Sequence, residues 1–471
     1  VGDGGAAISE GQWIKNVNEL QAMGKEDTTL KQTYFLYGDI DASATSKWNT
    51  DAGFSPVGTA GTTFAGTFDG LNHTITGLYI NRSETSRVGL IGYASGTIQN
   101  VGMAGGRITG KNTVGGVVGQ NWNIVKNVYN TGMVSGTNYI GGVVGENYGT
   151  VKNVYNTGAV GGTDYVGGVV AYNGNGVVEN VYNTGAVSGN SNVGGVVGQN
   201  WNIVKNVYNT GDAHGDSDVG GVVGYNGGTV TNAYDVSSRT DAEKYKASTY
   251  QGFDLDTTGG QDMVWRIYEG YTTPFLKSFL KTVTVSGSNQ TVEYDGNSHS
   301  IARDSLSYGT EIESGKVFLG ARRNAGSCTL ANMIYSVQDG YDFASENTFT
   351  IHPKSITASI AAGSTFDKTY DGTTEVKQPV QAAGLYDLDG VIEKDDVSLN
   401  IANASAVYAD KNAGTGKAVN FTGLALSGND AANYTFAGTA SGTGNIAAKN
   451  ITAGIAAGST FDKTYDGTTA V

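Results

Sequence analysis

Short apolar runs, separated by glycine and polar turns, occupy most of the first half of the chain and predict strands rather than helices. Runs such as GGVVG and TVKNVYNTG combine Val and Tyr, which favour strands, with Gly, Asn and Thr, which form helices poorly. Residues 16–23 are the exception, because their pattern predicts a short helix that ends before Gly24.

Two short strings of residues repeat together at a nearly constant interval. One is V-G-G-V-V-G-x-N, and the other, N-V-Y-N-T-G, runs in phase with it and degrades at Asn100 and Asn232. Such a period, with two short strand-like segments and glycine turns in each unit, predicts a β-solenoid of about 26 residues per coil. We favour a right-handed β-helix, because long coils are typical of that class. The string V-G-G-V-V-G-x-N or a close variant starts 26 or 27 residues apart, at Val88, Val114, Ile140, Val166, Val193 and Val219.

Stacked coils place equivalent residues about 4.8 Å apart along the solenoid axis, so the repeat predicts columns of identical side chains. Valines are expected in one apolar column, namely Val117, Val143, Val169, Val196 and Val222. Tyrosines are expected in a second column, namely Tyr129, Tyr155, Tyr182, Tyr208 and Tyr234. Stacked amides can hydrogen bond along the axis, which predicts an amide ladder of Asn127, Asn153, Asn180, Asn206 and Asn232.

The segments that flank the repeats, and the second half of the chain, have different residue patterns. Open solenoid ends expose unpaired strand edges and are normally covered, so we expect Trp265, Tyr268 and Phe275 to cover the last coil. Residues 451–471 nearly copy 356–376 at an offset of 95, a length that suits one β-sandwich-like domain per repeat. Because the second copy is cut short, we expect the chain to be a piece of a longer protein. The predicted domains are a cap with the first coils (1–87), the solenoid (88–235), its C-terminal cap (236–281), two small β domains (282–355 and 356–450) and a truncated repeat (451–471).

Composition narrows the class of protein without changing this all-β prediction. The 27 Tyr and 14 Phe, with only 15% charged residues, argue for an ordered chain rather than a disordered one. A net charge of −14 argues against nucleic acid as a partner. The single cysteine, Cys328, excludes an internal disulfide. The sequence has no run of about 18 apolar residues, so it predicts no membrane-spanning helix.

Several segments of the chain resemble known protein families. The cores VGLIG at Val88 and VGGVVG in later coils resemble the GLUG motif, and WIKNVNELQAM and WRIYEGYTTPFLK resemble the segments that flank such repeats. VEYDG, KTYDGTT and NYTF resemble β modules of the MBG and YDG types. The combination is similar to large secreted bacterial adhesins of the filamentous-haemagglutinin-like class. The resemblance implies a non-enzymatic protein of the cell surface or the extracellular space.

One position in each coil could contact a ligand. The residue after GGVVGxN is Trp122, Tyr148 or Trp201 in three coils and Gly174 or Gly227 in two others. If the aromatic rings face outward, they could stack on sugars from different coils. The alternative is that these rings pack against neighbouring coils or the turn.

Two acidic segments are candidates for catalysis or for Ca²⁺ binding. Some β-helix proteins are carbohydrate-active enzymes, and Asp212, Asp216 and Asp218 could supply paired carboxylates, although the nearly uniform coils argue against catalysis. No catalytic residue and no cofactor is predicted apart from a possible Ca²⁺ ion, for which an acidic turn is the alternative. The candidate Ca²⁺ ligands are Asp387, Asp389, Glu393, Asp395 and Asp396. The YDG sequence itself is interpreted as a turn in which Asp-Gly supplies a positive φ.

Three functions follow from these patterns. The leading hypothesis is an adhesin-like rigid stalk and binding module, whose partner is a host or neighbouring-cell glycan or protein, or copies of itself. The second is a structural subunit of an extracellular filament or matrix. The third is a carbohydrate-active β-helix enzyme.

Overall fold

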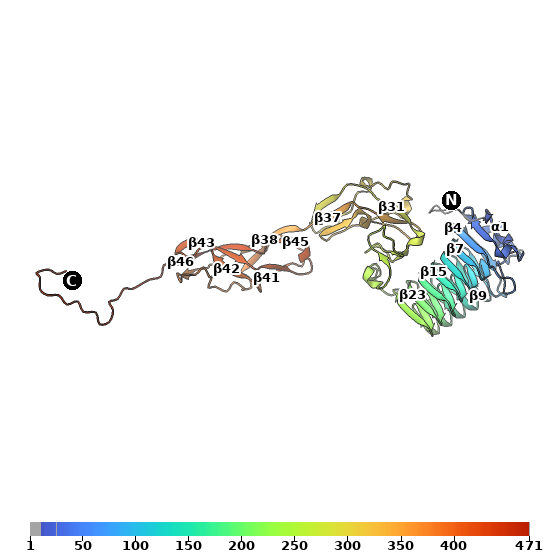
Figure 1. Ribbon diagram of the computed structural model, residues 1–471, viewed down its shortest axis with the longest axis horizontal. Helices are drawn as coiled ribbons and strands as arrows, with labels where there is room; N and C mark the ends of the chain where they lie inside the picture. Colours follow the sequence, from blue (N-terminus) through green and yellow to red (C-terminus); the bar gives the residue numbers. More distant parts are fainter. Residues whose placement is uncertain (1–10, 25, 471) are drawn as a thin grey trace. The chain divides into compact units, whose positions relative to one another are not determined.

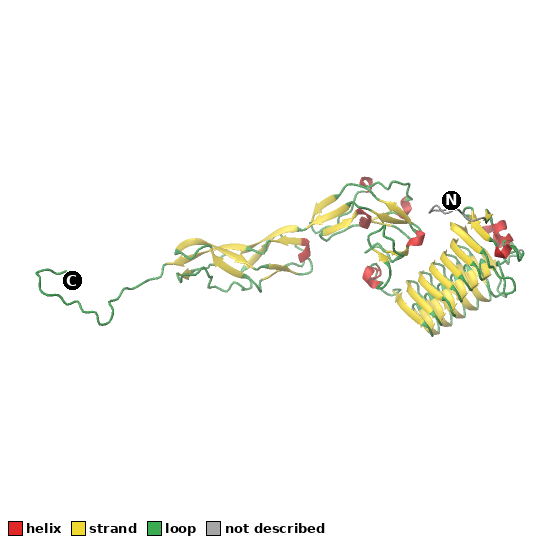
Figure 2. Cartoon of the chain, viewed as in Figure 1, coloured by secondary structure: helices red, strands yellow, loops and turns green. Residues whose placement is uncertain are grey.

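The computed structural model describes residues 11–24 and 26–470 and forms two compact units, the first of which contains the solenoid (Figure 1). Strand occupies 44% of the structure and helix 8%, which confirms the all-β prediction (Figure 2). Unit 1 comprises residues up to 288 with 301–320 and 329–347, and unit 2 comprises 289–300, 321–328 and 348 onward. Among the described residues, no helix has the length and apolarity needed to cross a lipid bilayer.

The solenoid is built from coils of four short strands, which stack in parallel into four sheets. Equivalent residues pair in register between coils, as in Val118 with Val144 and Val144 with Val170. The longest sheet runs β1 (Gln12–Ile14), β2 (Thr33–Leu36), β4 (Thr67–Thr76), β7 (Thr97–Ala104), β11 (Ile124–Asn130), β15 (Thr150–Asn156), β19 (Val177–Asn183), β23 (Ile203–Asn209) and β27 (Thr229–Asp235), with β3 (Ile40–Asp41) paired to β4.

The other three sheets complete each coil. One contains β6 (Ile91–Ala94), β10 (Val118–Asn121), β14 (Val144–Asn147), β18 (Val170–Asn173), β22 (Val197–Asn200) and β26 (Val223–Asn226). Another contains β5 (Tyr79–Asn81), β8 (Arg107–Thr109), β12 (Met133–Ser135), β16 (Val160–Gly161), β20 (Val187–Ser188) and β24 (Ala213–His214). The last contains β9 (Asn112–Gly115), β13 (Asn138–Gly141), β17 (Asp164–Gly167), β21 (Ser191–Gly194) and β25 (Ser217–Gly220).

The predicted short helix begins the solenoid. Helix α1 (Val17–Ala22) starts at Asn16, whose side-chain oxygen accepts hydrogen bonds from the backbone N–H groups of Asn18 and Glu19. This is the expected action of an N-cap residue. Leu20 and Met23 are buried in the same apolar core that continues through the coils, so the helix closes the N-terminal end of the valine column.

Two columns fill different spaces. The valine side chains Val117, Val143, Val169 and Val196 are fully buried inside the coils, and Val222 in the last coil is only partly buried. The rings of Tyr129, Tyr155, Tyr182 and Tyr208 stack outside this core at centroid distances of 4.9 to 5.0 Å.

The segment after the last coil covers the tyrosine column rather than the end of the solenoid. Trp265 packs against Tyr182 and Tyr208, and the Tyr208 hydroxyl donates a 2.6 Å hydrogen bond to the Pro274 carbonyl. The prediction that the aromatics of this segment cover the last coil is therefore wrong for Trp265. The rings of the column offer an apolar side face, and that face must be buried.

Tyr268 also lies elsewhere than predicted, whereas the prediction for Phe275 stays a prediction. The Tyr268 hydroxyl donates to the Tyr341 carbonyl, and Phe275 lies in β30. At the end of the solenoid, Val219 and Tyr225 remain 43% and 38% exposed.

The segment that follows the last coil contains α2 (Asp241–Lys244), β28 (Leu255–Asp256), β29 (Trp265–Arg266), β30 (Phe275–Leu276), β31 (Lys281–Thr284), β33 (Phe318–Leu319), β35 (Ile334–Tyr335) and β36 (Tyr341–Ala344).

Unit 2 is a set of small sheets. The sheet elements are β32 (Gln290–Glu293), β34 (Gly326–Thr329) and β37 (Thr348–His352); β38 (Lys354–Ile360), β40 (Tyr386–Asp389) and β45 (Tyr434–Phe436); β39 (Lys368–Thr369), β42 (Ser405–Tyr408), β43 (Gly414–Thr422) and β46 (Ala440–Ala447); and β41 (Ser398–Asn400) with β44 (Ala425–Ser427). Its largest core contains Phe366, Val419 and Phe421, with Ile360 and Tyr386 packed against them.

The YDG turn has the predicted geometry, because Gly372 has φ +80°. The Lys368 ammonium holds this turn by donating to the Asp371 carboxylate and the Thr373 carbonyl, at 2.9 and 2.8 Å. Eight short 3₁₀ helices complete the described structure: η1 (Thr29–Lys31), η2 (Ser43–Lys47), η3 (Ala247–Thr249), η4 (Lys277–Phe279), η5 (Arg303–Ser305), η6 (Ser314–Lys316), η7 (Leu330–Met333) and η8 (Ala431–Asn433).

Candidate ligand-binding face of the solenoid

Aromatic side chains line the turns that follow β10, β14 and β22. The Trp122 and Tyr148 rings, from neighbouring coils, stack at 4.4 Å with an interplanar angle of 16°. Trp122 and Trp201 remain 48% and 47% exposed. The rings therefore pack against neighbouring coils, as the alternative interpretation expected, and they also present surface to solvent.

Glycine at the same turn of the next coil makes room for the rings. A Cβ atom on Gly174 would lie 2.7 Å from the Tyr148 ring, and one on Gly227 would lie 2.6 Å from the Trp201 ring. Each aromatic side chain therefore leans along the axis over its C-terminal neighbour. Trp122 is instead followed by Tyr148, and these two rings stack.

Tyrosines from two adjacent columns extend the face. Tyr139 and Tyr165 stack at 4.6 Å with an interplanar angle of 6°, and Tyr172 meets Tyr139 edge-on at 5.8 Å. Tyr172 also lies 6.1 Å from Tyr148. Sequence reasoning missed these three tyrosines, although their recurrence two residues before Gly141 and Gly167, and next to Asn173, was a usable signal.

Glu146 carries the charge of this face. Burial raises the pKa of its carboxyl group, while Arg87 and a hydrogen bond with Thr113 act in the opposite direction. Burial, together with the Glu146 carboxylate, raises the pKa of Tyr148 to about 12. The Tyr148 hydroxyl therefore stays protonated and can donate a hydrogen bond at neutral pH.

We name the set Trp122, Tyr139, Glu146, Tyr148, Tyr165 and Tyr172 the aromatic face. Its rings contact one another, some stacked and some edge-on, so they do not form an open cage around a cation. Ring faces match the apolar C–H side of a sugar, and hydroxyl and carboxylate groups match its hydroxyls. A second, smaller pair is formed by Trp201 and Tyr225, whose centroids lie 5.5 Å apart.

The asparagine column forms a continuous chain of side-chain hydrogen bonds. Each Nδ2 donates to the Oδ1 of the preceding coil over 2.8 to 3.1 Å, through Asn100, Asn127, Asn153, Asn180, Asn206 and Asn232. All six have φ between 48° and 54°. Asn tolerates this left-handed conformation better than most residues, so both the backbone and the amide explain its presence here.

Two further amide ladders escaped sequence reasoning and are more deeply buried. The first runs through Asn121, Asn147, Asn173, Asn200 and Asn226, with steps of 2.8 Å. The second runs through Asn130, Asn156, Asn183 and Asn209, with steps of 2.9 Å. Both positions recur in most repeats, at the end of GGVVGxN and of NVYN, and that recurrence was their signal.

The acidic segments do not gather into a metal site within the described residues, where no group of three or more His, Cys, Asp or Glu side chains could hold an ion. Asp212, Asp216 and Asp218 are exposed around β24 and β25. The Ca²⁺ prediction is therefore wrong for the segment that contains Asp387, Asp389, Glu393, Asp395 and Asp396.

Asp395 has structural partners instead of a metal. Its fully buried carboxylate accepts hydrogen bonds from the Tyr294 and Tyr434 hydroxyls, each at 2.6 Å, and pairs with Arg323. Burial alone would raise the pKa of Asp395, but these three donors together lower it. Tyr294 and Arg323 lie before residue 356 and Asp395 lies after it, so these contacts join the last small β domain to the preceding strands of unit 2.

Comparison with known families supports the resemblance. The chain contains a GLUG motif at residues 189–213 and a YDG domain at residues 352–442. These matches confirm the predicted solenoid repeat family and the YDG type of the module that begins near residue 356. The MBG type of the preceding module and the domain boundaries stay predictions.

Two curated relatives match parts of the chain. Halomucin of Haloquadratum walsbyi is 39% identical over 124 residues, which is 25% of this chain and 1% of halomucin. A candidate Gly-rich membrane protein of Evansella cellulosilytica is 33% identical over 81 residues, 16% of this chain and 9% of that protein. The chain thus spans a small part of each relative. These similarities fit a surface protein.

A solved structure from Bacteroides ovatus, described as a candidate immunoglobulin A1 protease, covers 49% of this chain and 79% of its own. The two chains are 24% identical with a TM-score of 0.39. A similarity at this level carries no inference about activity.

Proposed function

We propose that this chain is a non-enzymatic binding and stalk module of an extracellular, adhesin-like surface protein, and that its aromatic face binds glycans. The observation that carries the proposal is the stacked Trp122–Tyr148 pair, in which Trp122 is half exposed and which is continued by tyrosines around Glu146. A soluble domain gains nothing in folding from leaving such large rings in water, and exposed aromatic patches commonly mark interaction sites.

The solenoid supports the stalk role. Its coils share one continuous apolar core and three amide ladders, so the rings on separate coils are held at fixed spacing. A rigid row of rings suits an extended polymer, because little conformational freedom of the protein is lost on binding.

The test is binding of the whole chain to an array of glycans and matrix proteins. We expect saturable binding to at least one glycan, and at least tenfold weaker binding after the combined change Trp122→Ala and Trp201→Ala. Trp13→Ala is the matched control, because Trp13 is also exposed (41%) but lies outside the face, against Phe35 and Tyr37. Silence of the intact chain, or equal binding by the double variant, would contradict the glycan-binding role.

A structural subunit of an extracellular filament is the second candidate, and the last coil favours it. Strands β25 and β26 end their sheets, so their outer edges have no strand partner among the described residues, and Val219 and Tyr225 are exposed there. Unpaired edges are templates for another chain. Sedimentation velocity of the purified chain between 1 and 100 μM tests this candidate, and a single monomeric species throughout would remove it.

A further inference from the structure

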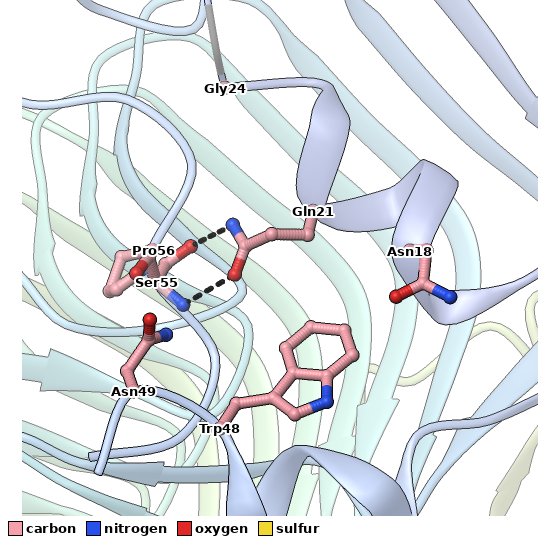
Figure 3. A pocket seen from close by; sticks show the side chains of 7 residues that line it. All are labelled: Asn18, Gln21, Gly24, Trp48, Asn49, Ser55 and Pro56. Atoms are coloured by element: carbon pink, nitrogen blue, oxygen red, sulfur yellow. Dashed lines mark hydrogen bonds between the residues drawn. The ribbon is translucent and has the colours of Figure 1, made fainter.

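A polar cavity of about 550 Å³ lies at the N-terminal end of the solenoid, separate from the aromatic face. Figure 3 shows the Trp48 indole as one wall of the cavity, between Asn18 and Gln21 of α1 and the loop that carries Asn49, Ser55 and Pro56. Gly24 lies at its edge. Its size falls in the range of small-molecule sites, roughly 300–1,000 Å³.

The walls of this cavity are fixed before any ligand binds. The Gln21 amide makes two hydrogen bonds with the Ser55 backbone, donating to its carbonyl at 2.9 Å and accepting from its N–H at 2.8 Å (Figure 3). The Asn49 amide donates to the Gly53 carbonyl at 2.7 Å. Trp48 packs partly buried against the core. A site whose groups are already ordered loses little entropy on binding.

The chemistry of the lining selects the class of ligand. All seven lining residues are uncharged, in a chain whose net charge is −14. Within the described part of the chain, the Asn18 amide and the Trp48 indole N–H have no hydrogen-bond partner, so both can bond a ligand. An amide both donates and accepts, as does a hydroxyl group. An indole ring with the free Asn18 amide beside it therefore matches a neutral, polyhydroxylated molecule with an apolar face.

We propose that this cavity is a second binding site, for a neutral saccharide, in which one sugar ring lies against Trp48 and its hydroxyls bond to the Asn18 amide. The site is independent of the aromatic face, because it uses the non-repeating start of the chain rather than the coils. It adds to the proposed function and does not require it.

The five tryptophans allow both sites to be followed at once. We would label the whole chain with 5-fluorotryptophan, which gives one ¹⁹F resonance each for Trp13, Trp48, Trp122, Trp201 and Trp265, and assign them by single Trp→Phe changes. The probes are cellotetraose, maltotetraose, chitotetraose, xylotetraose and mannotetraose, titrated to 10 mM. We expect at least one of them to shift the Trp48 resonance saturably.

Two variants locate the effect without disturbing the core. Asn18→Ala removes an exposed amide and should weaken the Trp48 response at least fivefold. Gly24→Tyr should block the cavity, and Gly24→Ala is its matched control, because a Cβ there meets Val57 only at ordinary contact distances of 3.5 Å and more.

The outcomes separate the two proposals. A Trp48 shift that Gly24→Tyr abolishes and Gly24→Ala preserves would support the cavity, whatever Trp122 and Trp201 do. A Trp48 resonance unmoved by all five probes, or a shift that persists in Gly24→Tyr, would overturn it. A response of Trp122 alone would leave the aromatic face standing and remove the cavity site.

Discussion

The buried amide ladder of Asn183 offers the sharpest test of how the solenoid is held together. The fully buried Asn183 side chain makes four hydrogen bonds, with Asn156 and Asn209 in the neighbouring coils and with the N–H and carbonyl of Gly185 in its own turn. Replacing it with Ala removes all four. Asn156 and Asn209 keep bonds to their own turns, so the Gly185 N–H and carbonyl lose their ladder partner.

The magnitude follows from those two groups. A buried polar group left without a partner costs about 1–3 kcal/mol, so Asn183→Ala should lower the free energy of unfolding by about 2–6 kcal/mol. The adjacent Thr184 is exposed in the same turn, and Thr184→Ala should change stability by no more than about 0.5 kcal/mol.

Equilibrium unfolding in urea, followed by tryptophan fluorescence, measures this difference. All five tryptophans lie between residues 13 and 265, so the signal reports unit 1 alone. A loss below about 1 kcal/mol for Asn183→Ala would refute the reasoning, because it would mean that water or local relaxation replaces the ladder bonds.

Two further predictions concern packing and pH. Gly168→Ala should lower the melting temperature by more than about 5 °C, because its Cβ would lie 2.0 Å from the Gly195 carbonyl oxygen. The control Gly161→Ala, whose Cβ would meet no atom closer than 3.5 Å, should change the melting temperature by no more than about 2 °C. Calorimetry that gives the two variants equal melting temperatures would contradict this. The pKa of Asp395 is lowered in the folded chain, so its stabilisation is present above the ordinary carboxyl pKa and is lost as the pH falls through the lower, folded value. Asp395→Asn, which discards the charge paired with Arg323, should lower the melting temperature of unit 2 at pH 7 and flatten its decline in acid; an unchanged acid profile would count against it.

The repeat could be predicted because its information is local and redundant. Identical residues 26 or 27 apart place themselves in columns once coils stack, so the positions of Val143, Tyr155 and Asn153 follow from spacing alone. The sequence could not show what lies outside the repeat. Nothing in the pattern around Trp265 distinguishes the end of the solenoid from its side, and the choice is made by the area of stacked tyrosine rings that needs cover.

Long-range partners explain the other misses. Asp395 looked like a cation ligand because its neighbours in sequence are acidic, but its counterion is Arg323, 72 residues earlier. The cavity at Trp48 was invisible for the same reason, since Gln21 and Ser55 are 34 residues apart and neither belongs to a repeating string. The half-exposed Trp122 was predicted as a candidate, and its stacking on Tyr148 agrees with the alternative that these rings pack against neighbouring coils.

The register of the coils also limits how genes for such chains can change in length. Among the coils that start at Val114 and later, one is a residue longer than the others, yet Asn147 pairs with Asn173 and Thr150 with Val177, so the extra residue is confined to the turn between β18 and β19. A duplication or deletion of one whole coil, in frame, would rejoin every column without a fault. A change by an odd number of residues inside a strand would turn the later side chains of that strand to the wrong face. Recombination between coils should therefore produce alleles that differ in the number of coils while their individual coils stay alike.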